Sequence, residues 1–193
     1  MQNTATAMLL RNSAVYDKPD LETTGSGGGT ISEIPAGYSV SGMDDAKFVW
    51  LDRPMLPDTG SHYWEVSLSA FPIYPGIIDD VVTPRSVGGY PTKGLGLEVD
   101  LSLGTTPWAE AAWGVTQSGA KIPNGSGTFG FIWNSNTSVL EIRRQNTNAR
   151  FFTLATPPAA VYAHCGFDAS GAAAIRLGVE GCLYPRPPSA RYL

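Results

Sequence analysis

The stretch that decides the fold runs from Gly60 to Ser69 and reads GSHYWEVSLS. Its apolar residues alternate with polar ones, which is the two-residue period of a β-strand and differs from the 3.6-residue period of a helix. The alternation therefore sorts the side chains onto two faces. The face that we expect to be buried carries Trp64, Val66 and Leu68. The opposite face carries Tyr63, Glu65 and Ser67.

The same alternation recurs on both sides of this stretch, in short runs separated by Gly, Pro, Asn and Ser. It predicts roughly eight to twelve strands, the clearest at 47–52, 62–69, 94–101, 111–116, 128–133, 139–144, 161–168 and 173–179. The further apolar positions that it assigns to core faces are Leu95, Leu97, Val99, Leu101, Phe129, Phe131, Trp133, Leu140, Ile142, Ile175, Leu177 and Val179. We expect an all-β, two-sheet antiparallel β-sandwich in which these sets interdigitate. The connections 134–138 and 169–172 are short enough to close antiparallel hairpins at the sandwich ends.

The 193 residues, 42% of them hydrophobic, are enough for one sizeable core. We expect a single domain over 1–193, with an irregular N-terminal segment (1–15) and a Pro-rich C-terminal tail (184–193). Only 16% of residues are charged and the net charge is −4, without a basic stripe, so nucleic acid is not an expected partner. The N-terminus lacks the pattern of a signal peptide and no apolar run reaches the length of a membrane span. These features predict a protein made in the cytoplasm without a signal peptide and without a membrane partner.

The chain offers little that points to catalysis. Glu98 and Asp100 lie two apart on one strand face, as in concanavalin-like glycanases, but the third acidic position of that pattern is Leu103. We interpret the two carboxylates as the solvent face of an amphipathic strand. No Gly-x-Ser-x-Gly elbow is present, and we expect the two histidines, His62 and His164, at the surface. The sequence therefore predicts no catalytic residue.

The cysteines and acidic residues do not predict a metal site or a cofactor. If the last two predicted strands form a hairpin, Cys165 and Cys182 are staggered by roughly six residues, or about 20 Å, beyond the roughly 7 Å limit of a disulfide. We expect both thiols to be reduced and Cys165 to be a small buried side chain. Asp79 and Asp80 are adjacent carboxylates without the frame of a calcium loop, and we interpret them as solvated loop charge.

The segment 71–93 is rich in Pro and Gly, and a loop of this length is often functional. Together with the 134–138 hairpin and a turn at 103–110, it is our predicted contact surface for a protein partner. The candidate partner-binding residues are Tyr74, Ile77, Ile78, Asp79, Asp80, Tyr90, Trp108, Asn134 and Asn136. Tyr74, Ile77 and Ile78 would be the apolar anchors.

The block Gly60-Ser61-His62-Tyr63-Trp64-Glu65-Val66 resembles the Gly-x-His-Tyr-Trp-Glu-Val strand of the SPRY domain, also called the B30.2 core, a concanavalin-like two-sheet sandwich. The run 127–133 is similar to a later strand of that family, and 161–167 with 173–178 resembles its closing pair of strands. The resemblance implies recognition of a protein or peptide through loops at one end of the sandwich, with no catalytic residue and no cofactor. Fold analogy by itself names no ligand.

Our leading hypothesis is therefore a non-enzymatic protein-recognition or assembly module whose partner belongs to a larger assembly. The low charge and the lack of a second domain favour a virion accessory, such as a bacteriophage capsid decoration or tail protein. A carbohydrate-binding module that stacks sugars on Trp108 or Trp113 is the alternative, with a glycan as partner. A glycan-cleaving enzyme that uses Glu98 is the third hypothesis.

Overall fold

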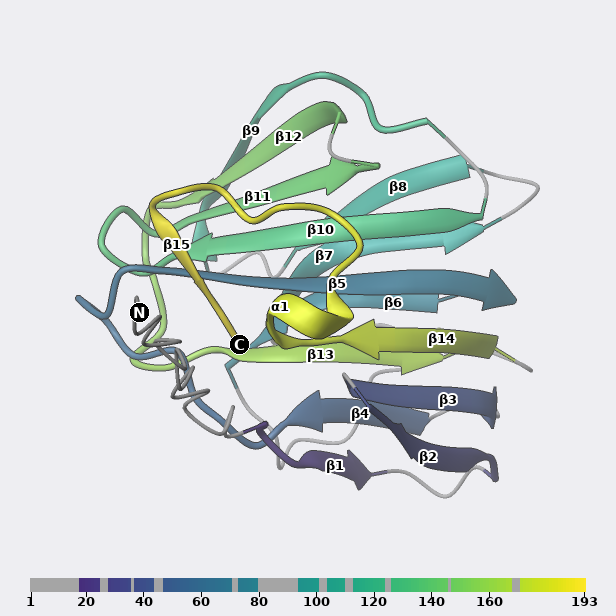
Figure 1. The fold of residues 1–193 in the computed structure, drawn as a ribbon. Helices are drawn as coiled ribbons and strands as arrows, with labels where there is room; N and C mark the ends of the chain where they lie inside the picture. The colour runs from purple at the N-terminus through teal and green to yellow at the C-terminus, as the bar shows by residue number, and fades with distance from the viewer. Residues whose placement is uncertain are drawn as a thin grey trace, which may run out of the picture.

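The computed structural model describes residues 18–24, 28–35, 37–43, 47–70, 73–79, 94–100, 104–109, 113–123, 126–145, 147–167 and 171–193. Over these residues the chain forms two stacked β-sheets and one short helix (Figure 1). No helix within the described ranges is long and apolar enough to cross a membrane. The two-sheet antiparallel sandwich predicted from the alternation is confirmed.

The first sheet has six strands among the described residues, in the order β1-β4-β13-β6-β7-β8. Their bounds are Leu21–Thr24 (β1), Lys47–Leu51 (β4), Tyr162–Phe167 (β13), Ile73–Ile78 (β6), Gly94–Asp100 (β7) and Gly104–Ala109 (β8). Every neighbouring pair is antiparallel.

The second sheet has nine strands in the described part of the chain, in the order β2-β3-β14-β5-β10-β11-β12-β9, with β15 added to β5. Their bounds are Thr30–Ile34 (β2), Gly37–Met43 (β3), Gly171–Arg176 (β14), Ser61–Ala70 (β5), Gly127–Asn134 (β10), Val139–Arg144 (β11), Thr147–Leu154 (β12), Val115–Gly119 (β9) and Ala190–Tyr192 (β15). The β15–β5 pair is parallel, whereas the other pairs are antiparallel.

The core lies between the sheets and is made from the predicted alternating faces. The sets led by Trp64, Leu95, Phe129 and Leu140 are each less than 5% exposed, and the rings of Trp64 and Phe131 stack at 5.3 Å. Burying one such side chain contributes about 1.5–3 kcal/mol, so these faces dominate the stability of the sandwich. Leu101, which we placed with them, lies outside the described residues.

Two predicted connections are wrong. Strand β13 belongs to the six-stranded sheet and β14 to the nine-stranded sheet, so the two strands do not pair and form no hairpin. The segment 103–110 is largely strand β8 and not a turn. Cys165 and Cys182 are nevertheless both free, as expected, although the pairing that led to this expectation does not exist.

The final predicted strand ends earlier than its apolar pattern suggested. Strand β14 stops at Arg176, and Gly178 adopts a φ of +66°, which breaks the alternation and starts the short helix α1 (Gly178–Gly181). Val179 therefore leaves the core and is 72% exposed, contrary to our expectation. The Pro-rich tail is also less irregular than predicted, since it ends in β15.

The C-terminal residues cover part of the outer face of the nine-stranded sheet, in front of β5 and β10 (Figure 1). Tyr63 and Ile132 point to this face and are buried there against Ala190, with Cys182 and Tyr192 packed around them. Glu65 lies on the same face and is 0% exposed. Tyr63 and Glu65, which we assigned to the outer face of β5, are thus correctly oriented, but they are not at the surface.

Candidate functional site

Three segments meet at one end of the sandwich, which we call the loop end and define by residues 18–20, 52–60 and 134–138. Ser61 pairs with Asn134, so the connection entering β5 and the turn leaving β10 lie side by side. The amide of Asp52 donates to the carbonyl of Asp20 at 2.9 Å, which brings the first segment to the second. The family resemblance predicts its recognition surface at such an end.

The 52–60 segment is held in one conformation by bonds at both of its ends. Met55 is 1% exposed and exchanges two backbone hydrogen bonds with Val161, at 2.8 and 3.3 Å. Thr59 donates its hydroxyl proton to the carbonyl of Leu56 at 2.6 Å, and the amide of Gly60 donates to Asn136 Oδ1 at 3.0 Å. The loop is therefore a preorganised surface.

Leu56 stands at the exposed tip of this fixed loop. Its side chain is 47% exposed, and the neighbouring Pro57 and Asp58 are also exposed. Among the described residues the other exposed large hydrophobic side chains are Val179 and Leu183, both in the C-terminal segment. Leu56 thus gives the loop end an apolar centre.

A buried histidine supports the loop from below. His62 is 4% exposed, with Nε2 at 2.9 Å from Thr59 Oγ1 and Nδ1 accepting from Arg191 Nε at 3.4 Å. Thr59 donates its proton to the Leu56 carbonyl and so does not donate it to the imidazole, and Arg191 Nη2 also lies 3.2 Å from Nε2. Burial, together with the charge of Arg191, lowers the pKa of His62 to about 4. This neutral imidazole positions groups and does not activate the threonine as a nucleophile.

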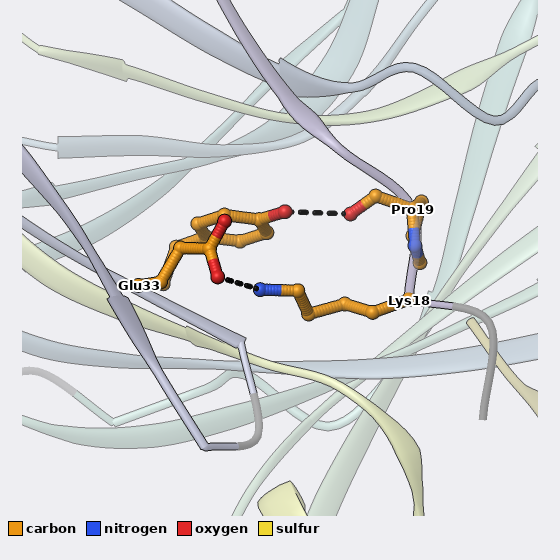
Figure 2. A network of polar contacts seen from close by, with 4 residues as sticks. Lys18, Pro19 and Glu33 are labelled. Atoms are coloured by element: carbon orange, nitrogen blue, oxygen red, sulfur yellow. Dashed lines mark hydrogen bonds and ion pairs between the residues drawn. The ribbon is translucent and has the colours of Figure 1, made fainter. Parts of the chain in front are cut away.

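A polar groove of about 360 Å³ borders the loop, lined by Lys18, Pro19, Asp20, Asp52, Arg53 and Pro54. Figure 2 shows how its wall is fixed: Lys18 Nζ lies 3.3 Å from Glu33 Oε2, and the Tyr38 hydroxyl donates to the carbonyl of Pro19 at 2.9 Å. Lys18 also lies over the Tyr38 ring at 4.0 Å. Burial raises the pKa of Tyr38, so the phenol remains a donor at neutral pH. The apolar tip at Leu56 is therefore flanked by a charged groove.

The predicted apolar anchors of the 71–93 loop are wrong. Tyr74, Ile77 and Ile78 lie in β6, between β13 and β7, and are 2%, 0% and 3% exposed. Because all three side chains are buried, they are not available as anchors for a partner. Asp79 follows β6 and is half-buried, while Asp80 and Tyr90 lie outside the described residues. Trp108 lies in β8, and its side chain is not among those described.

Asn134 and Asn136 do lie at the loop end. Asn134 Oδ1 accepts from the amides of Asn136 and Thr137, at 3.0 and 3.2 Å, and so shapes the turn. Asn136 is exposed and fixes the turn to Gly60. Their contact with a partner stays a prediction. Leu56 was missed, although a leucine inside the turn sequence Met55-Leu56-Pro57-Asp58 is a signal that could have found it.

Two other expectations about side chains are overturned. His164 is 2% exposed in β13, with its ring 5.5 Å from that of Phe48, and is not a surface group. Trp113 is 4% exposed and belongs to the main core, so it offers no platform for a sugar. Within the described residues no group of three or more His, Cys, Asp or Glu side chains is placed to hold a metal ion.

No protein-family model and no curated protein sequence matches the chain. Its structure is similar to the SPRY domain of human HERC1, with a TM-score of 0.56 at 6% identity, over 82% of this chain and 100% of that one. It is similar to the TRIM65 PSpry domain, with a TM-score of 0.50 at 14% identity, over 66% and 67% of the two chains. A protein with a galectin-like fold from Bacillus subtilis gives 0.52 at 16% identity, over 81% and 86%.

These likenesses agree with the two-sheet antiparallel sandwich described above. The identities are low, so they concern the arrangement of the strands. In its fold the chain is a concanavalin-like β-sandwich that is similar to SPRY domains.

Proposed function

We propose that the chain is a non-enzymatic protein-recognition module and that it binds its partner through the loop end, with Leu56 at the centre of the contact. The observation that carries this proposal is the 47% exposure of Leu56 on a segment fixed by Met55, Thr59 and Gly60. A large apolar side chain held in one place loses little entropy on binding. Because Leu56 is 47% exposed, its burial by a partner contributes roughly half of the 1.5–3 kcal/mol expected for a fully exposed leucine.

The surroundings of Leu56 match the composition of a recognition surface. Apolar anchors at the centre of an interface are usually ringed by polar groups that exclude water. Here the polar ring is supplied by the groove with Lys18 and Arg53 on one side and by Asn136 on the other. The fold resembles SPRY domains, and that resemblance implies protein recognition at one end of the sandwich.

The partner can be captured with the wild-type chain and two matched variants, Leu56→Ser and Val179→Ser. Both replace an exposed aliphatic residue, but Val179 lies on α1, away from the 52–60 segment. We expect Leu56→Ser to weaken partner binding at least about tenfold, as for loss of a central anchor, whereas Val179→Ser binds like the wild type. Quantitative mass spectrometry of the captured proteins, followed by a binding constant with the purified partner, measures this. Equal capture by all three chains would reject the loop end as the contact.

The biological setting that we propose is a virion, with the chain as an accessory such as a bacteriophage capsid decoration or tail protein. The low content of charged residues, 16%, supports a protein that is a permanent component of a larger assembly. Mass spectrometry of purified particles from the source of the gene tests this setting. Particles that lack the chain, together with a partner unrelated to virions, would exclude it.

A further inference from the structure

Strand β5 has two successive pairing partners along one of its edges. Its residues from Glu65 to Ala70 pair with β14, which ends at Arg176. Beyond that point Ser61, His62 and Tyr63 pair instead with β15, which runs parallel to them (Figure 1). The amide of Leu193 then donates to the carbonyl of Tyr63 at 2.9 Å. This part of β5 is a sheet edge that receives four extended residues.

The carboxylate of Glu65 extends the receiving site. It is 0% exposed and accepts from the backbone amides of Leu183 and Tyr184, at 2.7 and 2.9 Å, and from the Tyr63 hydroxyl at 2.6 Å. A buried carboxylate is tolerated only when its oxygens have donors. Two of the three donors belong to the incoming C-terminal segment, so Glu65 binds main-chain amides whatever their side chains.

Apolar contacts complete the site around the last four residues of the incoming segment. Ala190 packs on Tyr63 and Ile132, and the ring of Tyr192 lies 5.9 Å from that of Tyr63. The side chain of Leu193 is 1% exposed and enters the main core. The site thus favours an extended peptide with a small residue at the position of Ala190, an aromatic residue at that of Tyr192 and leucine at that of Leu193.

The link between this segment and the rest of the chain is weakly held. Helix α1 has four residues, and Val179 and Glu180 on it are exposed. The bond from Arg176 Nη1 to the carbonyl of Gly181 is long, at 3.5 Å. Detaching residues 182–193 therefore requires little change before Gly178.

We propose that the β5 edge from Ser61 to Glu65 is a peptide-docking site, and that residues 182–193 of a second copy of this chain can take the place of the chain's own segment. Most receiving groups lie on β5 and β10, with Gly178 adding a bond from its amide to the carbonyl of Leu193 at 3.2 Å, and the inserted groups lie in 182–193, so a segment from another copy can make the same contacts. Added strands of this kind gain affinity from main-chain bonds and specificity from side-chain pockets. Because the chain's own segment is covalently attached, its effective concentration at the site exceeds that of a segment from another copy. When the chain's own segment is released from the site, this advantage is lost.

The test uses the full chain with its own segment undocked by Leu193→Asp, or independently by Arg191→Pro, which removes one donor from an exposed position of β15. The probe is a fluorescent peptide with the sequence of residues 182–193, and the readout is anisotropy. We expect each variant to bind the peptide at least about tenfold more tightly than the wild type does. Adding Glu65→Gln to Leu193→Asp should weaken that binding by a similar factor. Circular dichroism identifies the variants that remain folded.

A second arm tests the second-copy occupant. A Glu65→Gln chain has a weakened docking site but an intact 182–193 segment. A Leu193→Asp chain has an intact docking site, but its own segment cannot dock. Mixed, they should form a one-to-one heterodimer by light scattering, while each alone stays monomeric. Folded variants that fail to bind the peptide would overturn the docking site, and a mixture without heterodimer would overturn the second copy as its occupant. Leu56→Ser should leave both results unchanged, because this site does not depend on the proposed function.

Discussion

The carboxylate of Glu65 lies 2.7 Å from the backbone nitrogen of Leu183, which follows it by 118 residues in the sequence. This bond joins the most recognisable strand of the fold to its last segment. It also explains how an acidic residue on the outer face of a sheet can be 0% exposed. Around Tyr63 and Glu65, strand β5 is therefore covered on both faces, by the opposite sheet and by the chain's own C-terminal residues.

Replacement of Glu65 should destabilise the fold. In Glu65→Gln one carboxylate oxygen becomes an NH₂ group that cannot accept a hydrogen bond, which leaves a buried amide of Leu183 or Tyr184 without its acceptor. We expect a loss of about 2–3 kcal/mol in the free energy of unfolding. Urea titration measures it, with Glu180→Gln on exposed α1 as the matched control. A Glu65→Gln chain as stable as the control would contradict the role assigned to this carboxylate.

The free energy of unfolding should decrease as the pH falls, because of His62. Its pKa is lowered to about 4 in the folded chain from 6.5, so the unfolded chain binds the proton more readily. The contribution of the neutral imidazole is therefore complete above pH 6.5 and declines as the pH falls toward 4. The free energy of unfolding, measured over this pH range, should decline toward low pH. The variant His62→Gln should show a smaller decline.

The charge of Arg191 contributes to this shift, after burial. In Arg191→Gln the pKa of His62, followed by NMR, should rise toward its ordinary value. An unchanged titration would show that the 3.4 Å contact between Arg191 and His62 has no electrostatic consequence.

The two thiols should differ once the C-terminal segment is undocked. Burial raises the pKa of both Cys165 and Cys182, and Cys182 also lies near Glu65. In the native protein both should react with a thiol reagent at least about tenfold more slowly than in the urea-unfolded chain. In Leu193→Asp, Cys182 should become reactive while Cys165, which is 0% exposed in the core, stays protected. Simultaneous exposure of both thiols would indicate global unfolding instead.

The contact between β6 and β7 should not tolerate a side chain. Gly76 faces Gly96, and a Cβ at Gly96 would lie 2.2 Å from the carbonyl oxygen of Pro75. Because that oxygen belongs to the backbone, the strands would have to separate. We expect Gly96→Ala to cost about 3 kcal/mol, whereas Ser118→Ala on exposed β9 should change stability by less than about 0.5 kcal/mol. Thermal unfolding of the two variants tests this, and equal midpoints would refute the close approach.

Most of the core could be predicted because alternation is a local property. Trp64, Phe131 and Leu97 each sit in a run whose period of two residues leaves one choice of buried face. Strand β6 could not be predicted in this way, because Pro75 and Gly76 are usually signs of a turn. The structure accommodates them because glycines on both strands allow the backbones to approach.

The candidate site was harder to predict, since it depends on which segments meet. Asn136 was predicted from its turn, but its bond to Gly60 joins residues 76 positions apart. The exposure of Leu56 depends in turn on the bond between Met55 and Val161, which anchors the loop below it. Neither contact can be predicted from a local sequence pattern.

By itself, the sequence determined the all-β class, the two-sheet arrangement and the buried faces of its main strands, because side-chain direction in a strand follows from position alone. Only the tertiary structure decided that Glu65 and Tyr63 are buried. Their face of β5 points away from the core, and it is covered there by residues more than 100 positions later. Burial on that side depends on where the end of the chain returns, and alternation carries no information about that return.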